Sequence, residues 1–342
     1  MSKSGSCSPH HLGPYKLGIL WVAFCLALAS MPRAHGQSTD RVHVTPLKVA
    51  PAAPMEGEPS RLSNLKPLSV DVNLVLVPVT VTDSANRLVT GLERDQFVLY
   101  EGDQHQHIRY FSSEETPISL GVILDLSKSM QDKIDDARRA VAEFFEAAHP
   151  QDDYFVITFS DRPEVLADVT QSIGTIRAKL ASAIPSGHTA LLDAIYLGVS
   201  KMRSTRYQRR ALLIISDGGD NRSRYRAREL KRIVQEADVG IYAIGIFGKV
   251  FTTPEEWAGK RLLTEITAVT GGRTITLNDA RELPAIAAAL SRELRSQYVL
   301  GYRPSNPARD GQWRQIQVRL APFSSSEPLH VYSKKGYFAP GH

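Results

Sequence analysis

Hydrophobic and polar residues follow one repeating scheme over the middle of the chain, in which short apolar runs alternate with longer amphipathic segments. The apolar runs predict β-strands over 119–125, 153–160, 164–169, 210–216, 239–246 and 273–277. The amphipathic segments predict helices over 131–147, 172–183, 190–202, 225–237, 260–270 and 280–295. This alternation is typical of an α/β fold, Rossmann-like, with a doubly wound, mostly parallel sheet and helices on both faces.

One pair of these strands departs from the parallel scheme. The segments 153–160 and 164–169 are joined only by residues 161–163, which are too few to form a crossover helix. We therefore expect this pair to be an antiparallel hairpin at an edge of the sheet.

The region that precedes the central domain has the pattern of β-strands. Residues 70–82 are dominated by β-branched side chains and predict a strand, in which Pro78 indicates an edge position or a bulge. Residues 96–100 and 107–111 predict a hairpin around a turn at 101–103.

The pattern returns to strands after residue 296, over 298–302, 313–320 and 329–332. These strands are too few for an independent sandwich. We therefore expect the C-terminal segment, 297–342, to pack with the N-terminal segment, 69–117, as a smaller β-rich unit beside the central domain, 118–296.

The N-terminal residues 1–36 predict a secretory signal. Lys3 and Lys16 supply positive charge, residues 17–29 form an apolar core, and small residues allow cleavage near Gly36. The core is short for a spanning helix, and an uncleaved membrane anchor is the alternative. Residues 37–68, rich in Pro, Ala, Ser and Glu, predict a flexible linker. We expect an exported protein, periplasmic or at the cell surface, with no transmembrane span in the mature chain.

Charge and cysteine content narrow the possible functions. The formal charge is +5, but the first 36 residues hold three of the 41 basic residues and no acidic one, so the remainder is close to neutral. The basic stretches 203–210 and 222–232 contain no recognised nucleic-acid motif and predict solvated surface, so we expect no nucleic-acid partner. Both cysteines, Cys7 and Cys25, lie in the predicted leader, which leaves no disulfide or thiol chemistry to the mature chain.

Three motifs carry the candidate chemistry. Asp125-x-Ser127-x-Ser129 follows a buried strand, Thr189 lies in the polar turn 186–194, and Asp217 begins an acidic, Gly-rich turn after another apolar strand. In a doubly wound sheet, ligands bind outside the carboxyl ends of the strands. Carboxylate and hydroxyl oxygens there suit a small hard cation such as Mg²⁺.

With these three motifs in this order, the chain resembles the von Willebrand factor A-type domain with its metal-ion-dependent adhesion site. The resemblance covers residues 118–296. It implies that Asp125, Ser127, Ser129, Thr189 and Asp217 hold Mg²⁺, or another divalent cation such as Mn²⁺ or Ca²⁺, directly or through water.

The flanking segments resemble those of an exported A-type family described mainly from Acidobacteria. Val79-Thr80-Val81-Thr82-Asp83 and Tyr100-Glu101-Gly102 are similar to the segment that precedes its A-type domain, and Tyr298-Val299-Leu300-Gly301-Tyr302 and Lys335-Gly336-Tyr337 to its ending. The likeness then runs from about residue 70 to residue 339.

The resemblance implies a binding protein and not an enzyme. Because the two serines are neutral ligands, the charge of the metal would be only partly cancelled. We expect the carboxylate of a protein partner to complete its coordination. The alternative function is that of an envelope scaffold in which the metal only ties loops together.

Each motif also has a structural interpretation. Asp125 and Ser127 could cap the helix that begins near residue 131, Thr189 could cap the helix at 190–202, and the Asp217 turn could be only a turn. Asp193 and Asp220 are expected to hold loops.

The sequence gives less support to two other functions, a serine hydrolase and a histidine metal site. A serine hydrolase using Ser127 or Ser129 with His188 and Asp217 lacks the Gly-x-Ser-x-Gly motif. His105 and His107 lack a third ligand at metal-binding spacing and are expected to face solvent.

Overall fold

The computed structural model describes residues 74–247, 254–322 and 328–341. The predicted signal (1–36), the predicted linker (37–68) and the first residues of the strand expected at 70–82 lie outside these ranges. Within them, no helix combines the length and apolar character needed to cross a membrane.

A six-stranded sheet forms the centre of the fold, and its order is β10-β9-β8-β5-β6-β7. The strands are β5 (Ser119–Asp125), β6 (Asp153–Phe159), β7 (Pro163–Thr170), β8 (Arg210–Ser216), β9 (Gly240–Ile246) and β10 (Thr274–Leu277). All pairs are parallel except β6 with β7, which lies at the edge. The predicted doubly wound α/β fold and its antiparallel edge hairpin are therefore confirmed.

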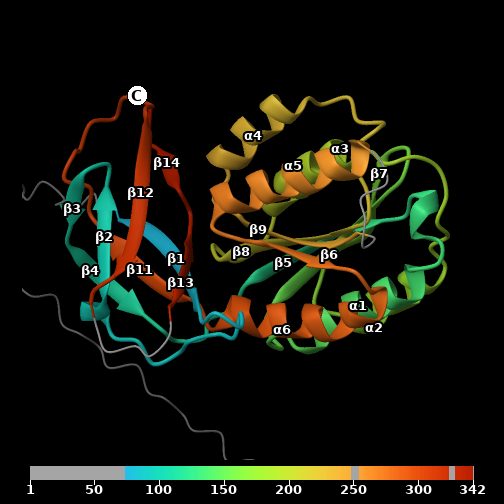
Figure 1. Ribbon diagram of the computed structural model, residues 1–342, viewed down its shortest axis with the longest axis horizontal. Helices are drawn as coiled ribbons and strands as arrows, with labels where there is room; N and C mark the ends of the chain where they lie inside the picture. The colour runs from blue at the N-terminus through green and yellow to red at the C-terminus, as the bar shows by residue number, and fades with distance from the viewer. Residues whose placement is uncertain (1–73, 248–253, 323–327, 342) are drawn as a thin grey trace, which may run out of the picture. The chain divides into compact units, whose positions relative to one another are not determined.

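Helices cover both faces of this sheet (Figure 1). One layer consists of α1 (Ile134–Glu146), α2 (Ile173–Ala181) and α6 (Leu283–Arg295), and the other of α3 (Leu191–Met202), α4 (Ala227–Glu236) and α5 (Pro254–Thr270). Side chains of β5 alternate between the two cores, with Val122 and Leu124 in one and Ile123 in the other. This two-sided burial explains why β5 is an uninterrupted apolar run.

The helix boundaries differ from the sequence prediction in two places. The helix expected at 131–147 begins only at Ile134, after a 3₁₀ turn at Lys128–Met130 and a turn at residues 131–133. The helix expected at 260–270 begins at Pro254, because proline is well accommodated in the first turn of a helix. Two further 3₁₀ turns, Arg94–Gln96 and Ala280–Glu282, precede β2 and α6.

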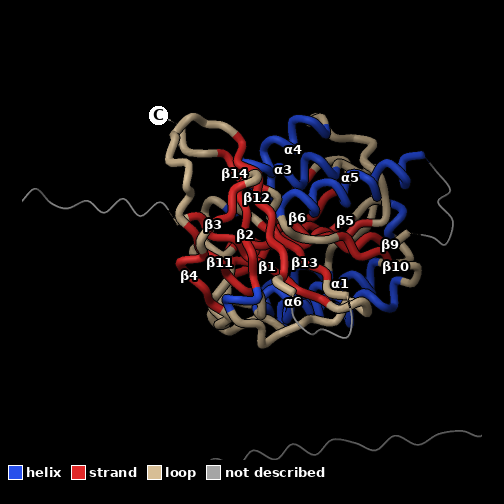
Figure 2. The backbone as a smooth tube through the Cα atoms, turned by 60° about the vertical axis from the view of Figure 1, so that its left-hand side comes forward, coloured by secondary structure: helices blue, strands red, loops and turns tan. Residues whose placement is uncertain are grey.

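Strands from both flanks make up two antiparallel sheets (Figure 2). The first has the order β13-β1-β11-β4, with β1 (Val75–Thr82), β4 (Ile108–Ser112), β11 (Tyr298–Tyr302) and β13 (His330–Ser333). The second has the order β14-β12-β2-β3, with β2 (Phe97–Glu101), β3 (Gln104–Gln106), β12 (Trp313–Leu320) and β14 (Gly336–Phe338). Apolar side chains of both sheets share one core, which confirms a β-rich unit built from the two flanks.

One prediction about this unit is wrong. The hairpin partner of β2 is β3, and residues 108–112 instead join the other sheet beside β11. The edge position expected at Pro78 is present locally: β1 as a whole pairs with both β11 and β13, but the pairing with β13 begins at Val79, so Pro78 has a strand partner on one side only. The missing N–H of proline is tolerated at such a position.

Gly121 lies where β5 packs most tightly, and we expect its replacement to destabilise the central sheet. A Cβ at Gly121 would lie 2.4 Å from the ring of Phe155 and 2.6 Å from Leu212. Gly121→Ala should lower the free energy of unfolding by about 1–3 kcal/mol, since overpacking a dense core forces its neighbours to move. Denaturant titration measures this change.

Gly174→Ala in α2 is the matched control, because a Cβ there meets nothing within 4 Å. This variant should be unchanged or more stable by up to about 1 kcal/mol. Equal unfolding free energies for the two variants would show that packing around β5 is looser than described.

Candidate metal site

The three predicted motifs meet at the carboxyl edge of the central sheet. β5 ends at Asp125 and the neighbouring parallel strand β8 ends at Ser216, one residue before Asp217. Ser127 and Ser129 lie in the turn that follows β5. The sheet topology therefore places residues that are far apart in the sequence on one small area.

Asp125 is the most buried group of the site, with an exposure of 0%. Its Oδ1 accepts a hydrogen bond from the Ser127 N–H (2.7 Å), and its Oδ2 accepts one from the Ser216 hydroxyl (2.6 Å). Burial is the main cause that raises the pKa of Asp125 to about 6, and the negative charge of nearby Asp217 adds to it. A cation beside this carboxylate would favour its ionised form.

Hydroxyl groups connect the turn after β5 to Asp217. The hydroxyl oxygens of Ser127 and Ser129 are 3.1 Å apart, and the Ser129 hydroxyl donates to Asp217 Oδ1 at 2.8 Å. Mg²⁺ binds oxygen at about 2.0–2.1 Å in octahedral geometry, which puts neighbouring ligand oxygens about 2.9 Å apart. The observed separations are also ordinary for hydrogen bonds between oxygens. The chemistry of the donor set, two hydroxyls and a carboxylate, suits Mg²⁺.

A lysine already contacts this oxygen cluster. The Lys133 ammonium forms an ion pair with Asp217 Oδ2, and the Asp217 side chain is only 1% exposed. The pair shows that a positive charge is accommodated beside Asp217, where it compensates a buried carboxylate.

The turn that contains Thr189 is held from both sides by backbone hydrogen bonds. The Thr189 carbonyl accepts from the N–H groups of Asn221 and Arg222, and the Thr189 N–H donates to Asn221 Oδ1. On the other side, the Ser186 N–H donates to the Leu126 carbonyl at 2.7 Å. Thr189 is thus fastened to the turn that follows Asp217, although the described hydrogen bonds do not join its hydroxyl to the other four candidate ligands.

An aspartate–histidine pair supports the same turn. Asp161 Oδ1 lies 2.7 Å from His188 Nδ1 and accepts the His188 N–H at 3.1 Å, and these contacts lower the pKa of Asp161. Gly187 has φ +78°, and a Cβ there would lie 2.6 Å from Asp161 Oδ2, so the turn requires glycine. His188 is thus oriented by Asp161, while the described hydrogen bonds of Ser129 go to Ser127 and Asp217.

The capping alternatives are met only in part. Ser127 occupies the N-cap position of the 3₁₀ turn Lys128–Met130 without a side-chain cap bond. The residue before α1 is Lys133 and the residue before α3 is Ala190, and neither helix has a side-chain cap. Asp193 and Asp220 hold loops, as expected. Asp193 accepts the N–H groups of Arg224 and Tyr225, and Asp220 accepts that of Leu191 and the Ser223 hydroxyl.

Sequence reasoning missed three residues that complete the site: Ser216, Lys133 and Asn221. Ser216 could have been found, because it is the last residue of an apolar strand and directly precedes Asp217. Lys133 and Asn221 carry no such signal, because their partners are distant in the sequence. Within the described ranges, no group of three or more His, Cys, Asp and Glu side chains forms a metal-binding cluster. The candidate site depends on hydroxyl ligands instead.

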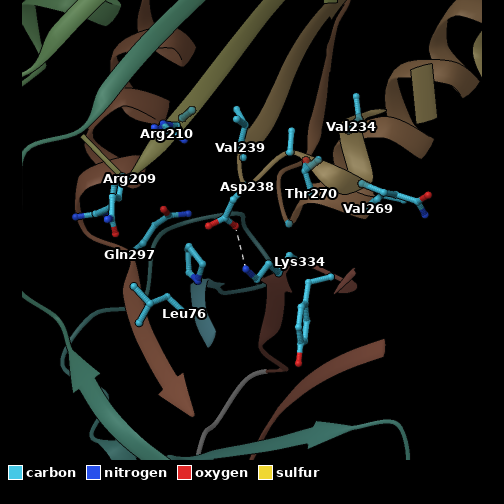
Figure 3. A pocket seen from close by; sticks show the side chains of 18 of the residues that line it. Leu76, Arg209, Arg210, Val234, Asp238, Val239, Val269, Thr270, Gln297 and Lys334 are labelled. Carbon is cyan, nitrogen blue, oxygen red and sulfur yellow. Dashed lines mark hydrogen bonds and ion pairs between the residues drawn. The ribbon is translucent and has the colours of Figure 1, made fainter. Parts of the chain in front are cut away.

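A cavity between β1 and the amino ends of β8 and β9 lies away from this site. It has a volume of about 380 Å³ and is lined by the amino ends of β8 and β9, including Arg210 and Gly240, and by residues of β1 such as Leu76 (Figure 3). An ion pair between Lys334 and Asp238 crosses it. None of the five candidate metal ligands lines this cavity.

The central domain has a doubly wound sheet with an oxygen cluster at its carboxyl edge. Residues 120–219, which lie within it, match the model of the von Willebrand factor type A domain. No curated protein sequence matches the chain.

Several solved structures are similar to parts of the chain. BatB, a conserved hypothetical protein from Bacteroides thetaiotaomicron, is 18% identical with a TM-score of 0.42, and the match covers 52% of this chain and 98% of that one. A von Willebrand factor type A protein from Catenulispora acidiphila is 13% identical with a TM-score of 0.47, covering 77% and 62%. The PilB minor pilin from Streptococcus sanguinis is 13% identical with a TM-score of 0.44, covering 54% and 63%.

Ser216→Ala tests whether the hydrogen bond from the Ser216 hydroxyl to the buried Asp125 carboxylate stabilises the fold. The substitution leaves one oxygen of a fully buried carboxylate without its partner, so the free energy of unfolding should fall by about 1–3 kcal/mol. Denaturant titration at neutral pH, without divalent cations, measures the loss.

Ser182→Ala provides the comparison, because Ser182 is exposed and its hydroxyl bonds only a nearby backbone carbonyl. Its effect should stay within about 0.5 kcal/mol. A Ser216→Ala protein as stable as this control would contradict the importance of the hydroxyl.

Proposed function

We propose that this protein is a divalent-cation-dependent binding protein, without enzymatic activity, that recognises a protein partner through Mg²⁺. The cation would be held by Asp125, Ser127, Ser129, Thr189 and Asp217, with Mn²⁺ or Ca²⁺ as possible substitutes. The single observation that supports this most is that the Ser127, Ser129 and Asp217 oxygens, hard ligands from two separate motifs, lie within hydrogen-bond distance of one another at the carboxyl edge of the sheet.

The ligand set explains why a partner would contribute an acidic group. Only two of the five candidate ligands are carboxylates, and Asp217 shares its charge with Lys133. Mg²⁺ held in this way retains positive charge and exchangeable water. A carboxylate of the partner would replace water and gain a strong electrostatic contact. Domains of the von Willebrand factor A type generally bind proteins, which agrees with this proposal.

Export to the periplasm or the cell surface forms part of the same proposal. It is supported by the leader pattern of residues 1–36 and by the similarity of the flanking segments to an exported family. The alternative is an envelope scaffold in which the cation only connects loops. The backbone bonds that already join the Thr189 turn to its neighbours count against that alternative, because they fasten the loops without a cation.

Asp125→Ala should abolish Mg²⁺ binding while the protein remains folded. The substitution removes the carboxylate on which the ligand cluster is built. Isothermal titration calorimetry with MgCl₂ measures the affinity, and circular dichroism checks the fold. Asp132→Ala serves as control, since Asp132 is an exposed carboxylate in the same loop. Unchanged Mg²⁺ affinity in Asp125→Ala would refute the site.

Binding and scaffold functions differ in what a column of immobilised protein retains. For a binding protein, envelope proteins should be retained in Mg²⁺, released by EDTA and not retained by the Asp125→Ala variant. For a scaffold, Mg²⁺ should raise the melting temperature of the protein, and the column should retain no envelope protein. This second result would favour the scaffold.

A further inference from the structure

Next to the candidate cation site lies a row of exposed arginines. Arg222, Arg224, Arg226 and Arg228 alternate along the segment that leads from the Asp217 turn into α4, and all four are exposed. None of them forms a salt bridge with another residue in the ranges that the structure describes. We name these four residues the arginine row.

Two of the acidic residues near the arginine row face the backbone, whereas Asp161, which pairs with His188 and also interacts electrostatically with Arg222, and Glu229 are exposed. Asp193 and Asp220 are partly buried and accept N–H groups of the surrounding turns, and Glu229 accepts the Arg226 N–H at 3.0 Å. Burial raises the pKa of Asp220, in agreement with its inward position. Asp193 and Asp220 therefore leave the four guanidinium groups exposed, with Asp161 and Glu229 as the exposed carboxylates nearby.

The row is physically joined to the cation site. The N–H of Arg222 donates to the Thr189 carbonyl at 3.2 Å, and the preceding residue, Asn221, accepts the Thr189 N–H at 2.9 Å. The row thus starts one residue from the groups that position a candidate metal ligand. Lys128, exposed between the two site serines, adds a further positive charge beside the site.

Stability does not explain the placement of these charges. Arg226 immediately precedes α4, and Arg228 is the second residue of that helix. The N-terminus of a helix carries partial positive charge, so cations there are unfavourable. A local cost of this kind, without an ion pair to offset it, is typical of a surface that serves a ligand.

We propose that the arginine row and the cation site together form a docking surface for an acidic stretch of polypeptide. One carboxylate of that stretch would coordinate the cation, and neighbouring carboxylates would pair with Arg222 and Arg224. This inference rests on the proposed cation-dependent function and identifies its partner more closely. Arg is well suited to the role, because its planar guanidinium binds carboxylates in a bidentate manner.

A polypeptide suits the row better than a nucleic acid. Single-stranded nucleic acids need free aromatic rings on which bases can stack. The aromatic residue within the row, Tyr225, is stacked on Tyr196 with 4.1 Å between ring centroids. Its ring face is therefore already used inside the protein.

The test uses the full chain and a fluorescein-labelled poly-L-glutamate peptide as probe, followed by fluorescence anisotropy with Mg²⁺ and with EDTA. Arg222→Gln/Arg224→Gln removes two charges while keeping the backbone bonds of the turn. Arg203→Gln/Arg206→Gln removes the same charge from exposed arginines at the opposite edge of the sheet. We expect the first pair to weaken Mg²⁺-dependent binding about tenfold or more at low salt, and the second pair to leave it nearly unchanged. Mg²⁺ affinity, from calorimetry, should stay the same in both.

The inference is overturned if both arginine pairs weaken the probe equally, if neither does, or if heparin or single-stranded DNA displaces poly-L-glutamate through the same arginines. If Asp125→Ala abolishes probe binding while Arg222→Gln/Arg224→Gln preserves it, the arginine row fails and the cation-dependent function stands. If the row binds the probe equally well in EDTA and in Asp125→Ala, the cation-dependent function fails and the shared docking surface fails with it.

Discussion

The burial of the Asp125 carboxylate is the constraint on which the candidate site depends. A carboxylate at the end of a central strand is costly unless each of its oxygens has a partner. The Ser127 N–H provides one, which bends the chain after β5. The Ser216 hydroxyl provides the other, which ties β5 to the end of β8. Satisfying one buried group therefore also fixes the turn that carries the serines and the strand that delivers Asp217.

The remaining loops are organised around this pair of strands. Backbone bonds join the Thr189 turn to Leu126 on one side and to Asn221 and Arg222 on the other. The position of Thr189 is consequently set by its neighbours and not by contacts of its own hydroxyl. Lys133 adds a positive charge to Asp217 from the helix side. The result is one edge of the sheet at which serine hydroxyls, two carboxylates and the Lys133 ammonium lie close together.

The sequence predicts those parts of the molecule whose signal is local. Strands such as β5 are buried on both faces and read as continuous apolar runs, and the Asp125, Ser127 and Ser129 motif marks the turn that follows. The division between β3 and β4 was missed, because only His107 separates them and alternation cannot show which sheet a strand joins. Lys133 could not be predicted as part of the site, because its partner Asp217 is 84 positions away.

The construction of the β-rich unit from both flanks has a consequence for synthesis. β1 has no strand partner until β11 is made, and β2, which pairs early with β3, lacks its second partner until β12 is made; both later strands follow the whole central domain in the chain. The central sheet draws all its strands from one continuous segment, so it can fold first. Until the last strands arrive, the N-terminal strands expose open hydrogen-bonding edges to other chains. A nascent or truncated form of the protein is therefore most exposed to aggregation at its N-terminal flank.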